Sequence, residues 1–207
     1  MIQTAPTQTA ASSDWHAFIS NPASYADAAR LADCFGGTIG EAACERMRQS
    51  QRLHERLSKL LLDHYGLSCT VDEPADDVDR AIALSSGEEL EELALRSGAI
   101  YQASSIAAVI AGREAAALQA ALGMDICSAA VANRDLAGPI QPLEPLDDIY
   151  NRVHADGLSC LCAWCQAMPR DTSMRVRLKL MPHELVDGTA IAPFAEIGPA
   201  IVRRAMR

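Results

Sequence analysis

Apolar residues recur at helical spacing along most of the chain. The longest example lies between Gly40 and His64, where one side is apolar and the other carries arginine and glutamate; its apolar positions are Cys44, Met47, Leu53, Leu57, Leu60 and Leu61. This spacing is typical of an amphipathic helix packed against a core. Gly66 follows, and glycine is the residue that most often ends a helix. We therefore predict one long helix that ends at Gly66.

A second series of helices is predicted from Ser85 onward. Ser85 and Ser86 precede Glu88 and Glu89, and both residue types favour a helix N-terminus. Gly112 and Gly123 then interrupt the pattern. Helices are expected at about 99–111, 113–122 and 124–136.

Another apolar stripe runs from Ile149 to Met168, interrupted at Gly157 and ended before Pro169, and it includes Cys162 and Cys165. The C-terminal segment "IVRRAMR" is expected to be helical as well. Its arginines suit the negative C-terminal end of a helix dipole.

The segment "MRVRLKL", residues 174–180, has a different pattern. Apolar residues alternate strictly with Arg175, Arg177 and Lys179, which by itself indicates a half-buried strand. A strand needs a partner, and the segment near Cys69 is the one available. A helix with a basic face is therefore an equal alternative.

These patterns predict a mainly α fold: a single multi-helix domain over residues 14–207, with one short two-stranded hairpin left open, after a flexible tail of residues 1–13. A short helix, "SDWHAFIS", is expected at the start of the ordered region, capped by Ser13. The 207 residues are 49% hydrophobic and only 4% aromatic, and alanine is abundant. Such composition favours helices.

The net charge limits the kinds of partner that the protein can bind. The formal net charge is −9, which repels polyanions and disfavours nucleic acid as a partner. The N-terminal residues lack a secretion-signal pattern, and the longest apolar stretch is too short and too rich in hydroxyl groups to cross a bilayer. We expect a cytosolic protein without direct membrane insertion.

Seven cysteines include the cluster Cys160, Cys162 and Cys165. On a helix Cys160 and Cys162 point about 160° apart, so the three thiols cannot share one metal ion. Cys162 and Cys165 have the CxxC spacing of a redox pair, but the residues before them are predicted to be helical, which removes the helix N-terminus that would stabilise a thiolate. Buried packing is the favoured interpretation, and a thiol-dependent oxidoreductase is the alternative.

The stretch "REAAALQAALGMDICSAAVANRDL" has the rhythm of a helix-turn-helix with Gly123 at the turn. Its second helix would present mostly alanine and few hydrogen-bond donors, whereas a helix that reads DNA needs donors and basic surroundings. Two packed helices are favoured, and a DNA-binding regulator is kept as a further alternative.

No catalytic, cofactor-binding or metal-binding pattern is found, so we expect no enzyme activity. Two charged segments are the candidates for partner binding. The first is acidic: residues 72–92 hold nine acidic residues and one arginine, a local charge near −8. The second is the basic segment 175–179. We expect each segment to meet an opposite charge on a different neighbour; the candidate residues are Asp76, Asp77, Glu88, Glu89, Glu91, Arg175, Arg177 and Lys179.

Residues 98–182 also resemble a known family. The stretch "GAIYQASSIAAVIAGREAAALQAALGMDICSAAVANRDL", the segment "DGLSCLCAWCQAMP" and "RVRLKLMP" are similar to the SctK (YscK-like) accessory proteins of bacterial type III secretion systems. The matching positions are glycines, leucines, a tryptophan and prolines, without catalytic content. They cover about two-fifths of the chain.

This resemblance implies a cytosolic, largely helical, non-enzymatic adaptor of the sorting platform, without a cofactor. The implied partners are the cytoplasmic domain of the SctD-like inner-membrane ring protein, which has a forkhead-associated fold, and the SctQ-like pod protein. The pod protein leads on to an SctL-like stator, an indirect partner. The cysteine cluster is not a hallmark of the family, and the acidic segment lies outside the matching region.

Overall fold

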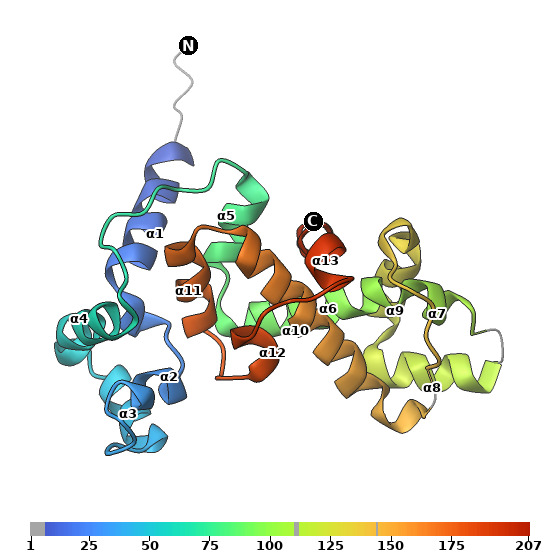
Figure 1. The fold of residues 1–207 in the computed structure, drawn as a ribbon, viewed down its shortest axis with the longest axis horizontal. Coiled ribbons are helices and arrows are strands. Elements are labelled where there is room, and N and C mark those ends of the chain that lie inside the picture. The colour runs from blue at the N-terminus through green and yellow to red at the C-terminus, as the bar shows by residue number, and fades with distance from the viewer. Residues whose placement is uncertain (1–6, 110–111, 144) are drawn as a thin grey trace, which may run out of the picture. The chain divides into compact units, whose positions relative to one another are not determined.

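A computed structural model of the protein describes residues 7–109, 112–143 and 145–207 (Figure 1). These residues form thirteen α-helices and four short 3-10 turns, and no strand lies among them. The predicted mainly α class is therefore confirmed.

The chain divides into two compact units. The first consists of residues up to Gly87 together with Pro169–Pro182. Its elements are α1 (Thr7–Ser20), η1 (Pro22–Ser24), α2 (Ala28–Asp33), α3 (Glu41–Arg48), η2 (Gln51–Leu53), α4 (His54–Tyr65), α5 (Asp77–Leu84) and α11 (Arg170–Leu178).

The second unit consists of Glu88–Met168 together with His183–Arg207. Its elements are α6 (Gly87–Tyr101), α7 (Ala103–Ala107), α8 (Gly112–Leu122), α9 (Met124–Ala132), η3 (Arg134–Leu136), η4 (Leu146–Asp148), α10 (Ile149–Ala167), α12 (Glu184–Asp187) and α13 (Phe194–Ala205). The single-domain organisation of residues 14–207 stays a prediction, because compact units can still unfold together.

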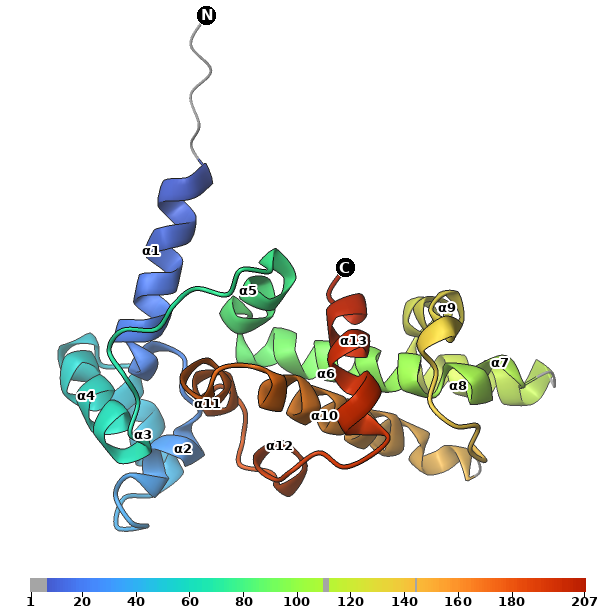
Figure 2. The ribbon, with the colours of Figure 1, turned by 45° about the horizontal axis from the view of Figure 1, so that its top comes forward.

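In the first unit α2 contacts α3, α4 contacts η1, and α11 contacts α5 (Figure 2). Its apolar core includes the fully buried Leu31, Leu61 and Leu178. Two aspartates begin helices here: the Asp27 carboxylate accepts the Ala29 N–H at 2.8 Å, and Asp76 accepts the Val78 N–H at 2.8 Å. Such caps satisfy amides that the first helical turn leaves without partners.

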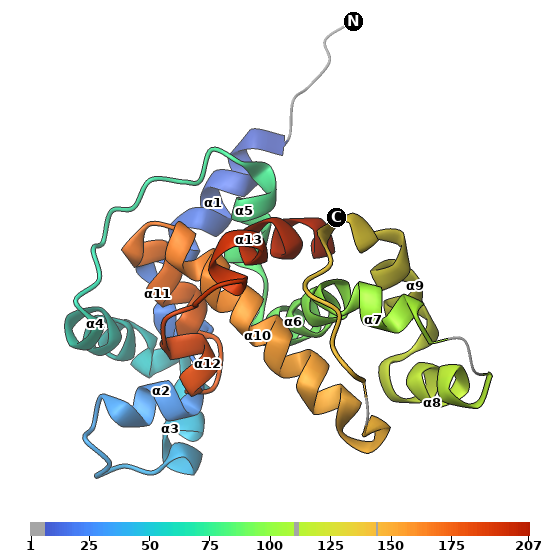
Figure 3. The ribbon, with the colours of Figure 1, turned by 45° about the vertical axis from the view of Figure 1, so that its right-hand side comes forward.

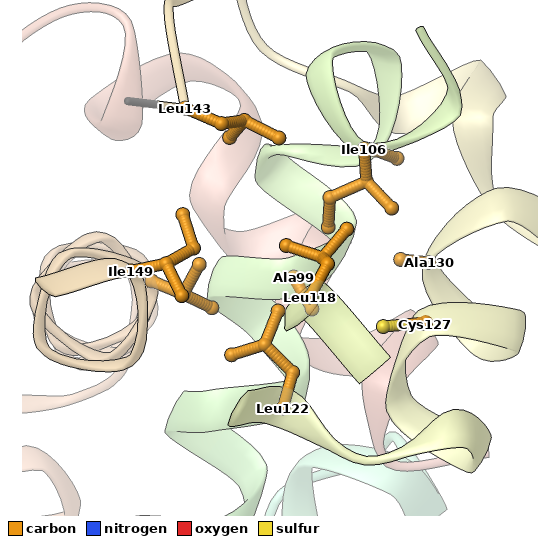
Figure 4. Packing of buried hydrophobic residues seen from close by; sticks show 10 residues of the cluster. Ala99, Ile106, Leu118, Leu122, Cys127, Ala130, Leu143 and Ile149 are labelled. Carbon is orange, nitrogen blue, oxygen red and sulfur yellow. The ribbon is translucent and has the colours of Figure 1, made fainter. Parts of the chain in front are cut away.

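In the second unit α10 contacts both α12 and α13 (Figure 3). A separate apolar cluster joins α6, α7, α8, α9 and the start of α10, as Figure 4 shows. Its buried members are Ala99, Ala103, Ile106, Leu118, Leu122, Cys127, Ala130, Leu143, Ile149 and Val153. The stripe predicted for α10 is buried from Ile149 to Cys165, but Cys160 and Trp164 outside it are buried as well, and the helix continues through Gly157, where an interruption was predicted.

The long helix expected before Gly66 is interrupted. Helix α3 ends at Arg48, and Ser50 takes an extended conformation with φ −88° and ψ 100° before η2 and α4 begin. Gln49, Ser50 and Gln51 are polar in succession and supply no apolar contact to hold a continuous helix. The predicted end is confirmed, because Gly66 is the C-cap of α4 in the left-handed region, with φ 60°.

The N-terminal expectation needs correction. Helix α1 begins at Thr7, so Ser13 lies within the helix rather than capping it, and residues 7–13 are not a tail without structure. The first six residues lie outside the described part of the chain. At the other end, the helix predicted for "IVRRAMR" is confirmed as the last part of α13.

The hairpin that the sequence left open does not form among the described residues. Residues 170–178 are the helix α11, and residues 67–70 near Cys69 are neither helix nor strand. Of the two alternatives for "MRVRLKL", the helical one is confirmed.

No single helix in the described ranges is long and apolar enough to cross a membrane. Helices α8 and α9 are together long and apolar enough to do so, but the chain bends by 106° between them at Gly123.

Candidate functional site

Arg175, one of the predicted partner-binding cations, is completely buried in the first unit. Its guanidinium donates hydrogen bonds to the carbonyl oxygens of Ile19 at 3.1 Å and Ser68 at 2.5 Å. Nη1 also donates to the Asp171 carbonyl at 3.2 Å and lies 3.6 Å from the Asp171 carboxylate. Arg175 therefore ties α11 to the C-terminal end of α1 and to the loop after α4.

Lys179 is buried in a similar way, with 7% of its surface exposed. Its ammonium group donates to the carbonyl oxygens of Ala83 at 2.6 Å and Ser85 at 2.5 Å, at the C-terminal end of α5. The same nitrogen lies 4.7 Å from the centre of the Phe18 ring and 5.2 Å from that of Tyr25. Carbonyl oxygens and aromatic faces both attract a cation when water is excluded.

The expectation of an exposed basic patch is thus wrong for Arg175 and Lys179, whereas Arg177 is half-buried. The strict alternation of apolar and basic residues reflects a helix that is buried on nearly all sides. Arg175 in this helix and Lys179 just after it donate to backbone carbonyls of the same unit. Arg175 and Lys179 therefore cannot form the basic docking surface that the sequence predicted.

The acidic candidates remain largely at the surface. Asp76 and Asp77 are exposed at the start of α5, and Asp77 pairs with Arg80 at 2.8 Å. Glu88 and Glu89 are exposed in the first turn of α6, but Glu91 is half-buried and lies 2.7 Å from His154. Because the boundary between the units falls at Gly87, Asp76 and Asp77 belong to one unit and the three glutamates to the other.

The three clustered thiols are buried, as the sequence predicted: Cys160 and Cys165 are fully covered and Cys162 is 1% exposed. Helix α10 continues through all three, and they lie in its last turns, where the helix dipole disfavours a thiolate. Burial raises the pKa of Cys160 well above its usual range, and the Asp156 carboxylate adds to this effect. In the described parts of the chain no three His, Cys, Asp or Glu side chains are placed to hold a metal ion.

The small size of these residues has a structural role. A Cβ atom added to Gly198 of α13 would lie 2.8 Å from the Cβ of Ala163 and 3.1 Å from the Cα of Cys160. The two helices therefore meet closely, at a place that large side chains on α10 would not permit. The Cys162 thiol donates to the carbonyl of Gly188 at 3.4 Å. The thiols are thus part of the buried end of α10, and this burial disfavours the oxidoreductase alternative.

The helix-turn-helix segment forms α8 and α9, with Gly123 at the turn as predicted, at φ 92°. No arginine or lysine occurs in Met124–Ala132. Its exposed large side chains are apolar, Met124 at 70% and Val131 at 49% exposure. A helix with this surface lacks the donors that base edges require, which disfavours the DNA-binding alternative.

Local sequence patterns did not identify a partly buried polar contact between α10 and the residue that follows α6. The side-chain nitrogen of Gln102 donates to the Asp156 carboxylate at 2.5 Å. Burial raises the pKa of Asp156, while the Gln102 hydrogen bond and the charge of Arg152 act in the opposite direction. The two residues are 54 positions apart, so no sequence motif signals their contact.

Comparisons with known proteins bear on the whole chain. The family model described as YOP proteins translocation protein K (YscK) matches residues 14–203. No curated protein and no solved structure matches the chain. The family match extends over residues of both compact units.

Proposed function

The chain belongs to the YscK family of type III secretion proteins, and from this membership we propose that it is a non-enzymatic adaptor of the secretion sorting platform. It links the cytoplasmic domain of the SctD-like inner-membrane ring protein to the SctQ-like pod protein. Through the pod protein it connects indirectly to the SctL-like stator. In this proposal the protein acts in the cytoplasm. Its partners hold it at the cytoplasmic face of the inner membrane.

The observation that carries the proposal is the family match over residues 14–203. This range includes most residues of both compact units, so the proposal is not limited to one of them. Within the family, the quoted segments "DGLSCLCAWCQAMP" and "RVRLKLMP" resemble PscK. This closer relationship is part of the proposal.

The distribution of charge supports a docking role. Exposed carboxylates lie at the start of α6, and Glu88 and Glu92 share one face because they are four residues apart. Complementary charges at a rim accelerate encounter and fix the register of docking more than they add to affinity. The acidic face of α6 is therefore proposed to meet a basic surface on one of the two partners.

Separate co-purification tests the function. The chain is expected to retain the ring protein's cytoplasmic domain in one experiment and the pod protein in another. The Glu88→Lys/Glu92→Lys variant should weaken one of these interactions and leave the other unchanged. Glu91 is left intact, because its contact with His154 holds α6 against α10. If the wild-type chain fails to retain one or both of these partners, the adaptor function is contradicted.

A matched variant controls for total charge. Glu41→Lys/Glu55→Lys makes the same charge change at exposed positions of α3 and α4 in the other unit. It should leave both interactions unchanged. If both variants weaken both partners equally, net charge rather than the α6 face determines the association.

A further inference from the structure

A hollow of about 320 Å³ lies in the second unit between α6, α9 and the end of α13. The helices that form it can be followed in Figure 3. Three of the residues that line it are arginines from separate parts of the chain: Arg96 of α6, Arg204 of α13, and Arg207. A protein with a net charge of −9 thus gathers cations around one depression.

The lining also has apolar members. Ile100 is 2% exposed, Ile126 of α9 is partly buried, and Ala129 lies one turn further along α9. Apolar residues in a hollow whose walls carry guanidinium groups suit a ligand that has both an apolar and an anionic part.

The three arginines make few and weak polar contacts within the second unit. Arg204 donates to the side-chain oxygen of Asn133 at 3.1 Å and lies 3.5 Å from Asp135. Arg96 lies 3.9 Å from Glu92, and both side chains are about half exposed or more. Such exposed pairs contribute little and are readily exchanged for another carboxylate. In the described residues, the Arg207 side chain makes no hydrogen bond or ion pair.

Each guanidinium group carries five N–H donors in a planar fork that matches the two oxygens of a carboxylate. The contacts with Glu92, Asn133 and Asp135 use only a few of the donors of these arginines. An extended polyanion is disfavoured, because Asp125 also lines the hollow and the net negative charge repels nucleic acid and anionic membranes. The positive region is small and fits a few acidic side chains.

We propose that this hollow, defined by Arg96, Arg204, Arg207, Ile100 and Ile126, is a docking site for an acidic, amphipathic segment of a partner protein. One or two carboxylates bind the guanidinium groups, and an apolar side chain packs on the two isoleucines. The assignment of the segment to a sorting-platform partner rests on the proposed function. The hollow thereby supplies the basic docking surface that the sequence placed on residues 175–179.

Two variants probe the hollow. Arg204→Glu/Arg207→Glu reverses two charges of the site, and Arg204→Gln/Arg207→Gln neutralises them with less disturbance of the Asn133 contact. Arg46→Glu/Arg52→Glu is the matched control, since these arginines are exposed on α3 and η2 in the other unit. Circular dichroism melts show whether each variant remains folded.

The first measurement uses a labelled synthetic peptide, Ac-LEELLEEL-NH2, with Ac-LKKLLKKL-NH2 as the reverse-charge comparison. By fluorescence anisotropy, the acidic peptide should bind wild type and control equally, and at least about tenfold more weakly to both hollow variants. Binding should weaken with added salt, as expected for exposed charges. Equal binding to wild type and hollow variants, or no binding to wild type, overturns the proposal.

The second measurement uses the purified ring domain and pod protein. A hollow variant should lose at least about tenfold in affinity for one of them, with the control variant within about twofold of wild type. Wild type that binds the acidic peptide through the hollow but binds neither partner supports the site and contradicts the proposed function. The two hypotheses are therefore separable.

Discussion

Gly98 of α6 and Gly157 of α10 face each other where these two helices cross. A Cβ atom on Gly98 would lie 1.7 Å from the carbonyl oxygen of Val153, and one on Gly157 would lie 1.7 Å from that of Ala94. Real Cβ atoms do not approach other atoms within 3.0 Å. The helix backbones are therefore in direct contact, and the absence of two side chains sets the distance between α6 and α10.

Replacing Gly98 with alanine should destabilise the protein. The added methyl group forces α6 away from α10 and disturbs their shared packing, and overpacking of this kind costs about 1–3 kcal/mol. The free energy of unfolding, measured by urea denaturation, should fall by about this amount. The control is Gly112→Ala at the start of α8, where a Cβ would meet nothing within 4 Å. There the change should be neutral or stabilising by up to about 1 kcal/mol; equal effects at both sites would contradict the close crossing.

The chain's two lysines should differ sharply in reactivity. Lys59 is exposed on α4, whereas Lys179 is buried against the carbonyls of Ala83 and Ser85. An amine-reactive reagent followed by mass spectrometry should label Lys59 at once and Lys179 only when the protein unfolds. Rapid labelling of both lysines in the native protein would show that Lys179 is exposed, as its sequence pattern indicated.

Substitution of the same two lysines gives an energetic test. Lys179→Met removes a cation from two buried carbonyl oxygens and should lower the free energy of unfolding by roughly 3 kcal/mol. Lys59→Met should change it by less than about 0.5 kcal/mol. Similar small values at both positions would show that the Lys179 contacts do not stabilise the fold.

The cysteines should react in order of their burial. Cys69 is exposed, Cys34 is half-buried, and the other five are buried. Burial and the neighbouring Asp33 also raise the pKa of Cys34 to about 11, which slows its reaction at neutral pH because the thiolate is the reactive form. Titration with a thiol reagent should modify Cys69 fast, Cys34 slowly, and five thiols only in denaturant. Fast modification of Cys162 or Cys165 would revive the redox alternative.

Removing the CxxC thiols should affect stability alone. Cys162→Ala/Cys165→Ala leaves partly emptied packing sites at the buried end of α10, and we expect a loss of about 1–3 kcal/mol in the free energy of unfolding. Secretion at a temperature where the variant remains folded should match wild type. Cys69→Ala is the control, because its side chain is exposed. Abolished secretion by a fully folded double variant would contradict the packing role.

Asp156 predicts a dependence of stability on pH. Its pKa in the folded protein is raised above the ordinary carboxyl value by burial, so the native state holds this proton more tightly than the unfolded state. The contribution to stability is complete below the ordinary carboxyl pKa and is lost as pH rises through the raised value. Asp156→Asn removes this loss. The free energy of unfolding of the variant relative to wild type should therefore increase as pH rises from 4 to 7; a constant difference would contradict the raised pKa.

Local sequence patterns were sufficient where one helix face decides the structure. The apolar stripe of α10 placed Val153, Leu161 and Cys165 in the interior, and Gly66 and Gly123 marked a helix end and a turn. These features depend on residues within a few turns of one another. The mainly α class followed from them.

The same patterns were insufficient where a distant segment decides the structure. Arg175 and Lys179 are buried because backbone carbonyls from α1, α5 and the loop after α4 accept their hydrogen bonds, and no local signal reveals those acceptors. The arginines of the hollow are likewise far apart in sequence: Arg96 and Arg204 are brought together only by the packing of α6, α9 and α13. Hydrogen-bond acceptors from distant segments, and sites built from several segments, can be identified only from the structure.

An adaptor must hold both of its partners at the same time, and a bridging experiment measures this. The ring protein's cytoplasmic domain is immobilised, and the pod protein is added with and without this chain. The adaptor account predicts that the pod protein is retained only when the chain is present, in a complex that contains all three proteins. Retention of the pod protein without the chain, or mutually exclusive binding of the two partners to it, would contradict the account.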